Sequence, residues 1–137
     1  ENVPGIDFIN KLRQVSYTLD ATGLYAFYNK KDKTSHSLTA EGNAIHQKAL
    51  QEKEKITYTG FIAQEVEAAA KQLGFDFSGV DAARNEHDTY GLRYAEFVMP
   101  LVKAVQELSK QNQDLKKQNE ELAKRIEKLE SIPISNK

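Results

Sequence analysis

Residues 98–130 read VMPLVKAVQELSKQNQDLKKQNEELAKRIEKLE, and this stretch decides the fold. Leucines recur in it at a strict spacing of seven, and a second set of residues falls between them. Together the two sets fill the a and d positions of a heptad repeat, with Leu at every d: Val98, Leu101, Val105, Leu108, Asn112, Leu115, Asn119, Leu122, Ile126 and Leu129. An apolar repeat of about 3.5 residues drifts around a straight helix, so it is buried only when helices supercoil around one another. The heptads therefore predict an oligomer of parallel, in-register helices.

The alternative is a long helix packed against its own domain. Outside the a and d positions, residues 108–130 are almost entirely Gln, Asn, Lys and Glu, which leaves a stripe too narrow for a core-facing helix. Asn112 and Asn119 both fall at a, where a buried Asn costs stability but pairs with its counterpart and penalises slipped or antiparallel arrangements. The e and g positions carry little charge. Asn at a favours dimers in other coiled coils. The row of a and d residues, here called the seam, therefore does not by itself distinguish a dimer from a trimer.

Composition bounds the remaining possibilities. The 137 residues fit one modest domain, residues 1–93, a helical stalk, residues 94–130, and a flexible tail, residues 131–137. The net charge of −1 argues against a nucleic-acid partner, and no apolar run approaches the roughly 20 residues that cross a bilayer. The absence of cysteine excludes disulfides and thiol chemistry. Because the chain opens at Glu1 without Met, it is expected to be a piece of a longer protein.

Local patterns predict a small α+β domain ahead of the long helix. Val15, Tyr17 and Leu19 alternate with polar residues as in a half-buried strand, and Gly74 stands where a glycine would end a helix. Pro100 should kink the long helix or mark a break in it. The expected elements are a helix at 6–12, strands at 15–19, 24–28 and 56–62, a turn at 21–23, a surface helix at 37–54, a helix at 61–73, strands at 75–81 and 89–93 around a polar loop at 82–88, and a helix from 94 onward.

No residue pattern supports catalysis, a metal site or a cofactor. His36, His46 and His87 share no ligand spacing. Glu65 and Glu67 point to different sides of a helix, so they make a poor acid–base pair; one is expected to bond to backbone and the other to be solvated. Lys11 and Ser16 could suggest a Ser–Lys dyad, but the alternation around Ser16 turns that residue outward.

Three segments of the sequence are distinctive enough to indicate a family. They are Val15-Ser16-Tyr17, Gly60-Phe61-Ile62-Ala63-Gln64-Glu65-Val66-Glu67, and the later block that runs from Tyr94 through Pro100 to Leu108. Together they closely resemble the C-terminal intramolecular chaperone domain of phage endosialidase tailspikes and other tail fibres, which has relatives on bacterial surface proteins. The resemblance covers most of the chain, and residues 21–55 look like an insertion in it.

The resemblance implies a homotrimer at the end of a fibre, on a phage virion or a bacterial cell surface. Such a domain aligns three chains, promotes folding of the preceding β-rich shaft of the same polypeptide, and releases itself by self-cleavage. The family cuts with a Ser and a Lys in a phrase expected upstream of Glu1, so no catalytic residue is carried over and this fragment is expected to be proteolytically inert. Residues 60–67 carry over as a strand-to-helix core element, with Gln64 and Glu65 as its expected polar contacts.

The rival interpretation is a permanently attached trimerisation or adhesion module. Its aromatic platform would be formed by Tyr25, Phe27, Tyr28 and Tyr58, although aromatic residues at strand spacing are more often part of a core. Mass spectrometry of a longer parent chain distinguishes the two, since only the chaperone yields a discrete shorter product. An enzyme is the third and weakest possibility.

Overall fold

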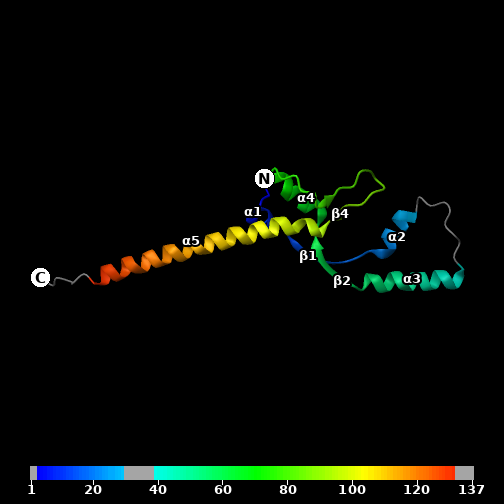
Figure 1. The fold of residues 1–137 in the computed structure, drawn as a ribbon. Coiled ribbons are helices and arrows are strands. Elements are labelled where there is room, and N and C mark those ends of the chain that lie inside the picture. Colours follow the sequence, from blue (N-terminus) through cyan, green and yellow to red (C-terminus); the bar gives the residue numbers. More distant parts are fainter. Residues whose placement is uncertain (1–2, 30–38, 132–137) are drawn as a thin grey trace.

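The computed structural model describes residues 3–29 and 39–131 as a small mixed domain with a long helix leading away from it. The long helix α5, Val98–Glu130, follows directly on a 3-10 turn η1, Tyr94–Phe97. At about 1.5 Å per residue, its 33 residues span roughly 50 Å. A mixed α+β domain followed by a long C-terminal helix is thus confirmed. Figure 1 shows α5 on one side of the domain and, on the other, a helical arm that contains α2, Ala21–Asn29, and α3, Ala40–Glu54.

Two strands distant in sequence form the main sheet. β1, Gln14–Thr18, pairs antiparallel with β2, Thr57–Phe61, and Ser16 lies opposite Thr59. The expected strands at 15–19 and 56–62 are confirmed to within a residue or so. A second sheet joins only β3, Val80–Asp81, to β4, Gly91–Leu92.

Helix α4, Ala63–Gln72, begins immediately after β2. Gly74 has a φ of 62°, the left-handed conformation in which a glycine ends a helix without strain, as expected from the sequence. The short helix α1, Ile6–Ile9, is confirmed over the first part of its expected range. Helix α3, Ala40–Glu54, is also confirmed, and Thr39 caps it by accepting a hydrogen bond from the Gly42 amide.

Two predictions about local structure are wrong. Residues 21–28 form neither a turn nor a strand but a helix, α2, Ala21–Asn29. The carboxylate of Asp20 accepts a hydrogen bond from the Gly23 amide at 2.7 Å, which satisfies a free donor of the first turn, as an N-cap does. One aromatic residue of α2 then packs on a neighbouring helix: Tyr25 lies against His46 of α3 with ring centroids 4.4 Å apart.

The strands expected at 75–81 and 89–93 shrink to two residues each. Phe75 and Phe77 are partly buried in the core instead of alternating across a sheet. The Phe75 amide donates to the carbonyl of Ala70, so the end of α4 directs this segment back across the core.

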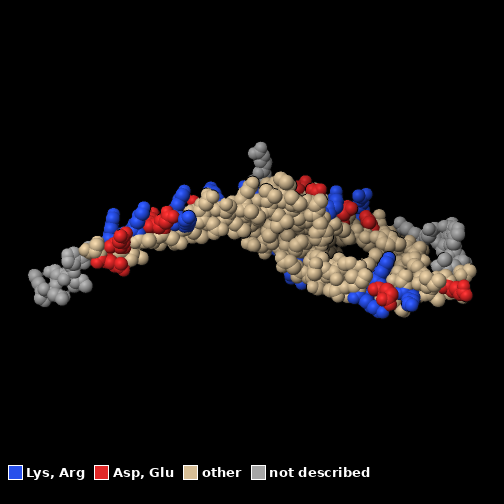
Figure 2. Space-filling model, turned by 60° about the horizontal axis from the view of Figure 1, so that its bottom comes forward, with Lys and Arg blue, Asp and Glu red and all other residues tan. Residues whose placement is uncertain are grey.

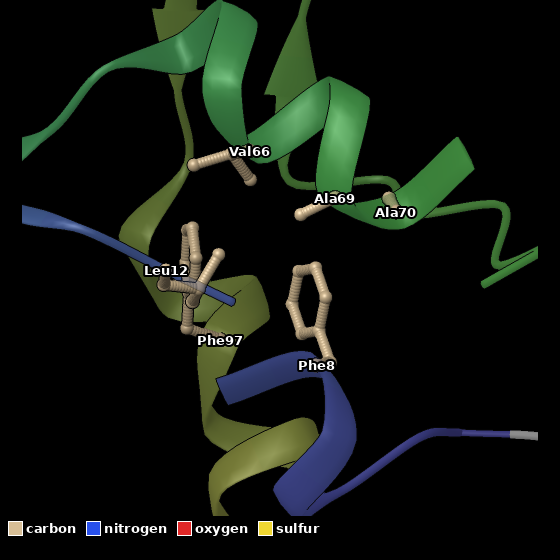
Figure 3. Packing of buried hydrophobic residues seen from close by; sticks show 6 residues of the cluster. All are labelled: Phe8, Leu12, Val66, Ala69, Ala70 and Phe97. Atoms are coloured by element: carbon tan, nitrogen blue, oxygen red, sulfur yellow. The ribbon is translucent and has the colours of Figure 1, made fainter. Parts of the chain in front are cut away.

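The core lies where α1, α4 and η1 meet. Figure 3 shows the buried side chains directed toward one another: Phe8, Leu12, Val66, Ala69, Ala70 and Phe97. Phe8 is fully buried and contacts the rings of Phe75, Phe77 and Phe97 at centroid distances of 5.0 to 6.4 Å. The domain therefore packs onto the root of the long helix, that is, onto its N-terminal residues 98–107.

Pro100 marks a change of helix type. It is the third residue of α5, just after the 3-10 turn, so its missing amide donor falls within the first turn, where no intrahelical bond is lost. Pro100 and Ala104 are both buried, and the backbone at Gly5 comes so close that an added Cβ would meet the Ala104 nitrogen at 2.8 Å.

Candidate oligomerisation interface

The a and d residues lie along one face of α5, and none of them is covered by the rest of the chain. The exposed fractions of the apolar ones run from 47% for Leu101 to 68% for Leu129, and Asn112 and Asn119 are exposed as well. The seam residues on this exposed face are Val98, Leu101, Val105, Leu108, Asn112, Leu115, Asn119, Leu122, Ile126 and Leu129. Contiguous exposed apolar surface of this length is rare on monomers and indicates an interaction site.

One shallow groove lies on this seam and a second lies beside it. One, of about 480 Å³, is lined by residues that include Val105, Leu108 and Asn112. Another, of about 230 Å³, lies beside Leu122 and Arg125. Hollows between successive seam residues are what a knob from a facing helix fills in a coiled coil.

Most charged residues of α5 lie away from the seam, and the exceptions, Lys116, Arg125 and Glu130, flank it at e or g. Figure 2 shows charged side chains gathered along one edge of the helix and uncharged atoms along the other. The position farthest from the seam, f, carries lysine in four successive heptads: Lys103, Lys110, Lys117 and Lys124. Such a division between a basic outer row and an apolar inner row suits a helix whose seam faces other helices.

The motif at residues 60–67 forms the junction of β2 and α4. The Tyr94 hydroxyl accepts a hydrogen bond from the Phe61 amide at 3.2 Å, and it lies so close to Gly60 that any Cβ there would collide with it. Phe61 stacks against Phe97 with ring centroids 5.4 Å apart. The junction therefore holds η1 directly against the sheet.

The next residues of the motif begin α4. Ile62 is its N-cap residue, and its carbonyl accepts from the amides of Glu65 and Val66. Ala63 and Val66 are buried against the core, whereas Gln64 is exposed at a pocket of about 500 Å³ that Tyr17 and Tyr94 also line.

The two glutamates of the motif make separate ion pairs, so the expectation of one backbone bond and one solvated carboxylate is wrong. Glu65 accepts two hydrogen bonds from the Arg13 guanidinium, at 2.5 and 3.0 Å, and these hold its pKa below the ordinary value. Glu67 accepts from Lys71 at 2.6 Å, which lowers the pKa of its carboxyl despite partial desolvation. The hydroxyl of Tyr90 donates to Glu67 as well.

The two residues that could suggest a Ser–Lys dyad have different surroundings. The Lys11 ammonium donates to the side-chain oxygen of Gln72, and Ser16 is exposed on β1. Within residues 3–29 and 39–131, no group of His, Asp and Glu could hold a metal ion. The helices of the same ranges include none with the length and apolar character to cross a bilayer. His36 lies outside the described residues.

The four aromatic residues considered for an adhesive platform lie on two different elements, and three of them, Tyr25, Tyr28 and Tyr58, are exposed. Tyr25 packs on His46, Phe27 on Tyr28, and Tyr58 on Tyr17 across the sheet. Three of them belong to α2 and one to β2.

Comparisons with protein-family models, curated proteins and solved structures find no match to this chain. The resemblance to fibre chaperones therefore depends on the sequence phrases alone. Sequence reasoning missed the contact of Tyr94 with Gly60 and Phe61. A glycine inside an expected strand was the available signal, since it often marks close approach of another group.

Proposed function

We propose that this chain is an intramolecular chaperone that trimerises through α5 and aligns the chains of an upstream fibre or tailspike for folding. The observation that carries the proposal is the continuous exposed seam of α5, joined without a linker to a small packed domain. The sequence phrases at residues 15–17, 60–67 and 94–108 favour a fibre chaperone and a trimer over a dimer.

The physical task of such a domain is to speed up the correct alignment of the three shaft chains. A β-rich shaft folds slowly because its chains must make non-local contacts before anything stabilises them. The helices that carry the seam form from contacts local in sequence, so they are ready to associate early, and their association raises the effective concentration of the attached chains. In-register helices also fix the stagger of the three chains, and Asn112 and Asn119 penalise a slipped register.

Release completes the proposed role. Self-cleavage ahead of the domain would leave an assembled shaft held by a high unfolding barrier rather than by reversible equilibrium. The family resemblance assigns that cut to a Ser and a Lys, and no residue of this sequence is assigned to it. The proposed cellular context is a fibre precursor of a phage virion or a bacterial surface protein.

Two experiments test the proposal. Sedimentation equilibrium of this chain at micromolar concentration should give the mass of a trimer, and a monomer would refute the assembly. Mass spectrometry of a parent chain carrying its upstream shaft should then show a discrete cut at one serine, abolished by Ser→Ala without loss of the trimer. A parent that trimerises and is never cut would instead identify a permanently attached trimerisation or adhesion module.

A further inference from the structure

The apolar face of α5 is wider at its root than farther along the helix. With a at Val98 and d at Leu101, Met99 falls at b and Val102 at e, and these two are 62% and 44% exposed. The same positions in later heptads are polar or small: Gln106, Gln113, Glu120 and Glu127 at b, and Ser109, Lys116, Ala123 and Glu130 at e. The extra apolar surface is thus confined to the part of α5 that carries the globular domain.

The opposite flank of the root is covered by the same chain. Phe97 and Ala104 are g residues and Pro100 is a c residue, and all three are buried. Helix α1 and the residues before it cover this flank. Gly5 lies on Ala104, and the Ile6 amide donates to the Glu107 carboxylate at 2.9 Å.

In a parallel coiled coil, the e position of one helix faces the g position of the next helix. Here the g flank of the root is occupied by α1, so the e residue of a neighbouring helix must meet α1 rather than a bare helix. Ile6 and Ile9 of α1 are half-buried and still present apolar surface. We infer that each α5 root packs its Met99 and Val102 against α1 of the next chain, an inference that rests on the trimer proposed above.

The occupant of this surface is a second copy of the chain because the surface is continuous with the seam. Val102 lies beside Val98 and Val105, four residues before it and three after it on the helix, so a molecule covering it also borders the seam. Beyond the root, where a neighbour would present only a helix, the b and e positions lose their apolar character. The interface therefore extends from the coiled coil onto the globular domains, which complete one another around the three-fold axis.

Cysteine crosslinking tests this contact directly, because the chain has no cysteine of its own. The full chain carrying Ile9→Cys and Val102→Cys is treated with a short bis-maleimide and run on a denaturing gel. We expect a ladder up to a covalent trimer. The matched control joins Val102→Cys to Ile45→Cys, on the far arm and 72% exposed, and should stay monomeric on the gel.

Sedimentation of the same samples distinguishes the Ile9–Val102 contact from the trimeric assembly. A trimer in solution without the Ile9–Val102 ladder overturns this contact and leaves the proposed assembly intact, whereas a monomer removes both. A second pair of variants needs no crosslinker: Val102→Lys should lower the thermal midpoint of the globular domain, and Ser109→Lys, at the next e position, should not. Equal midpoints for the two lysine variants overturn the inference.

Discussion

Replacing Leu115 with Ala should dissociate the assembly. Leu115 is a d residue in the middle of α5, and 55% of it remains exposed in the single chain. Leu→Ala at buried sites costs about 2–5 kcal/mol, and we take the lower limit because only half of the residue awaits a partner. At about 2 kcal/mol per chain, the trimer loses about 6 kcal/mol, which weakens association by roughly four powers of ten.

The assay is sedimentation equilibrium over a concentration series. The parent should remain a trimer at concentrations where Leu115→Ala is monomeric, and both should keep the same helix signal from the globular domain. Lys117→Ala is the matched control, since it lies two residues away at the outer f position and should sediment as the parent does. If Leu115→Ala and the parent associate equally well, the seam assignment is refuted.

Three further changes test other parts of the molecule. Changing Asn112 and Asn119 together to Ile should raise the thermal midpoint while allowing other registers or oligomer numbers, and a lower midpoint would remove these residues from the seam. Phe8→Ala should cost the globular domain about 3–5 kcal/mol in urea unfolding, while Ile45→Ala at an exposed position should stay within about 0.5 kcal/mol of the parent. Because Glu65 has a lowered pKa in the folded chain, its contribution is present above its ordinary value of 4.5 and is lost as pH falls through the folded value. Acid melting curves of Glu65→Gln should therefore fall less steeply than those of the parent, and identical slopes would contradict the ion pair.

The parts of the fold that depend on local sequence could be predicted. The heptad ladder gives α5 because the period of its apolar residues admits no other element. Gly74 and Thr39 mark a helix end and a helix start through backbone and side-chain bonds to near neighbours. The alternation of Val15, Tyr17 and Leu19 with polar residues predicts β1, although Tyr17 is exposed in the folded chain.

The parts that depend on distant contacts could not be predicted. The aromatic residues of α2 have high strand propensity, but Asp20 caps a helix there and His46, far along the chain, gives Tyr25 a surface to pack on. Phe75 and Phe77 pack against Phe8 in the core, and this contact, not the alternation of a strand, determines where their side chains lie.

The same division applies to the candidate site. The a and d positions follow from periodicity, and all of these residues are exposed in the single chain. The hydrogen bond between Tyr94 and Phe61 joins residues 33 positions apart in the sequence. The ion pair between Arg13 and Glu65 joins residues 52 positions apart. No pattern in a single sequence encodes such pairings, because they exist only once the chain has folded.

The helical arm that interrupts the sheet has an evolutionary consequence. Its buried residues, Ala21 and Leu50, pack within the arm and do not belong to the core cluster around Phe8. The strands β1 and β2 pair over five residues each, and the cost of closing a longer or shorter connection between them grows only slowly with its length. A connection of different size can therefore replace this arm without redesigning either the core or the long helix.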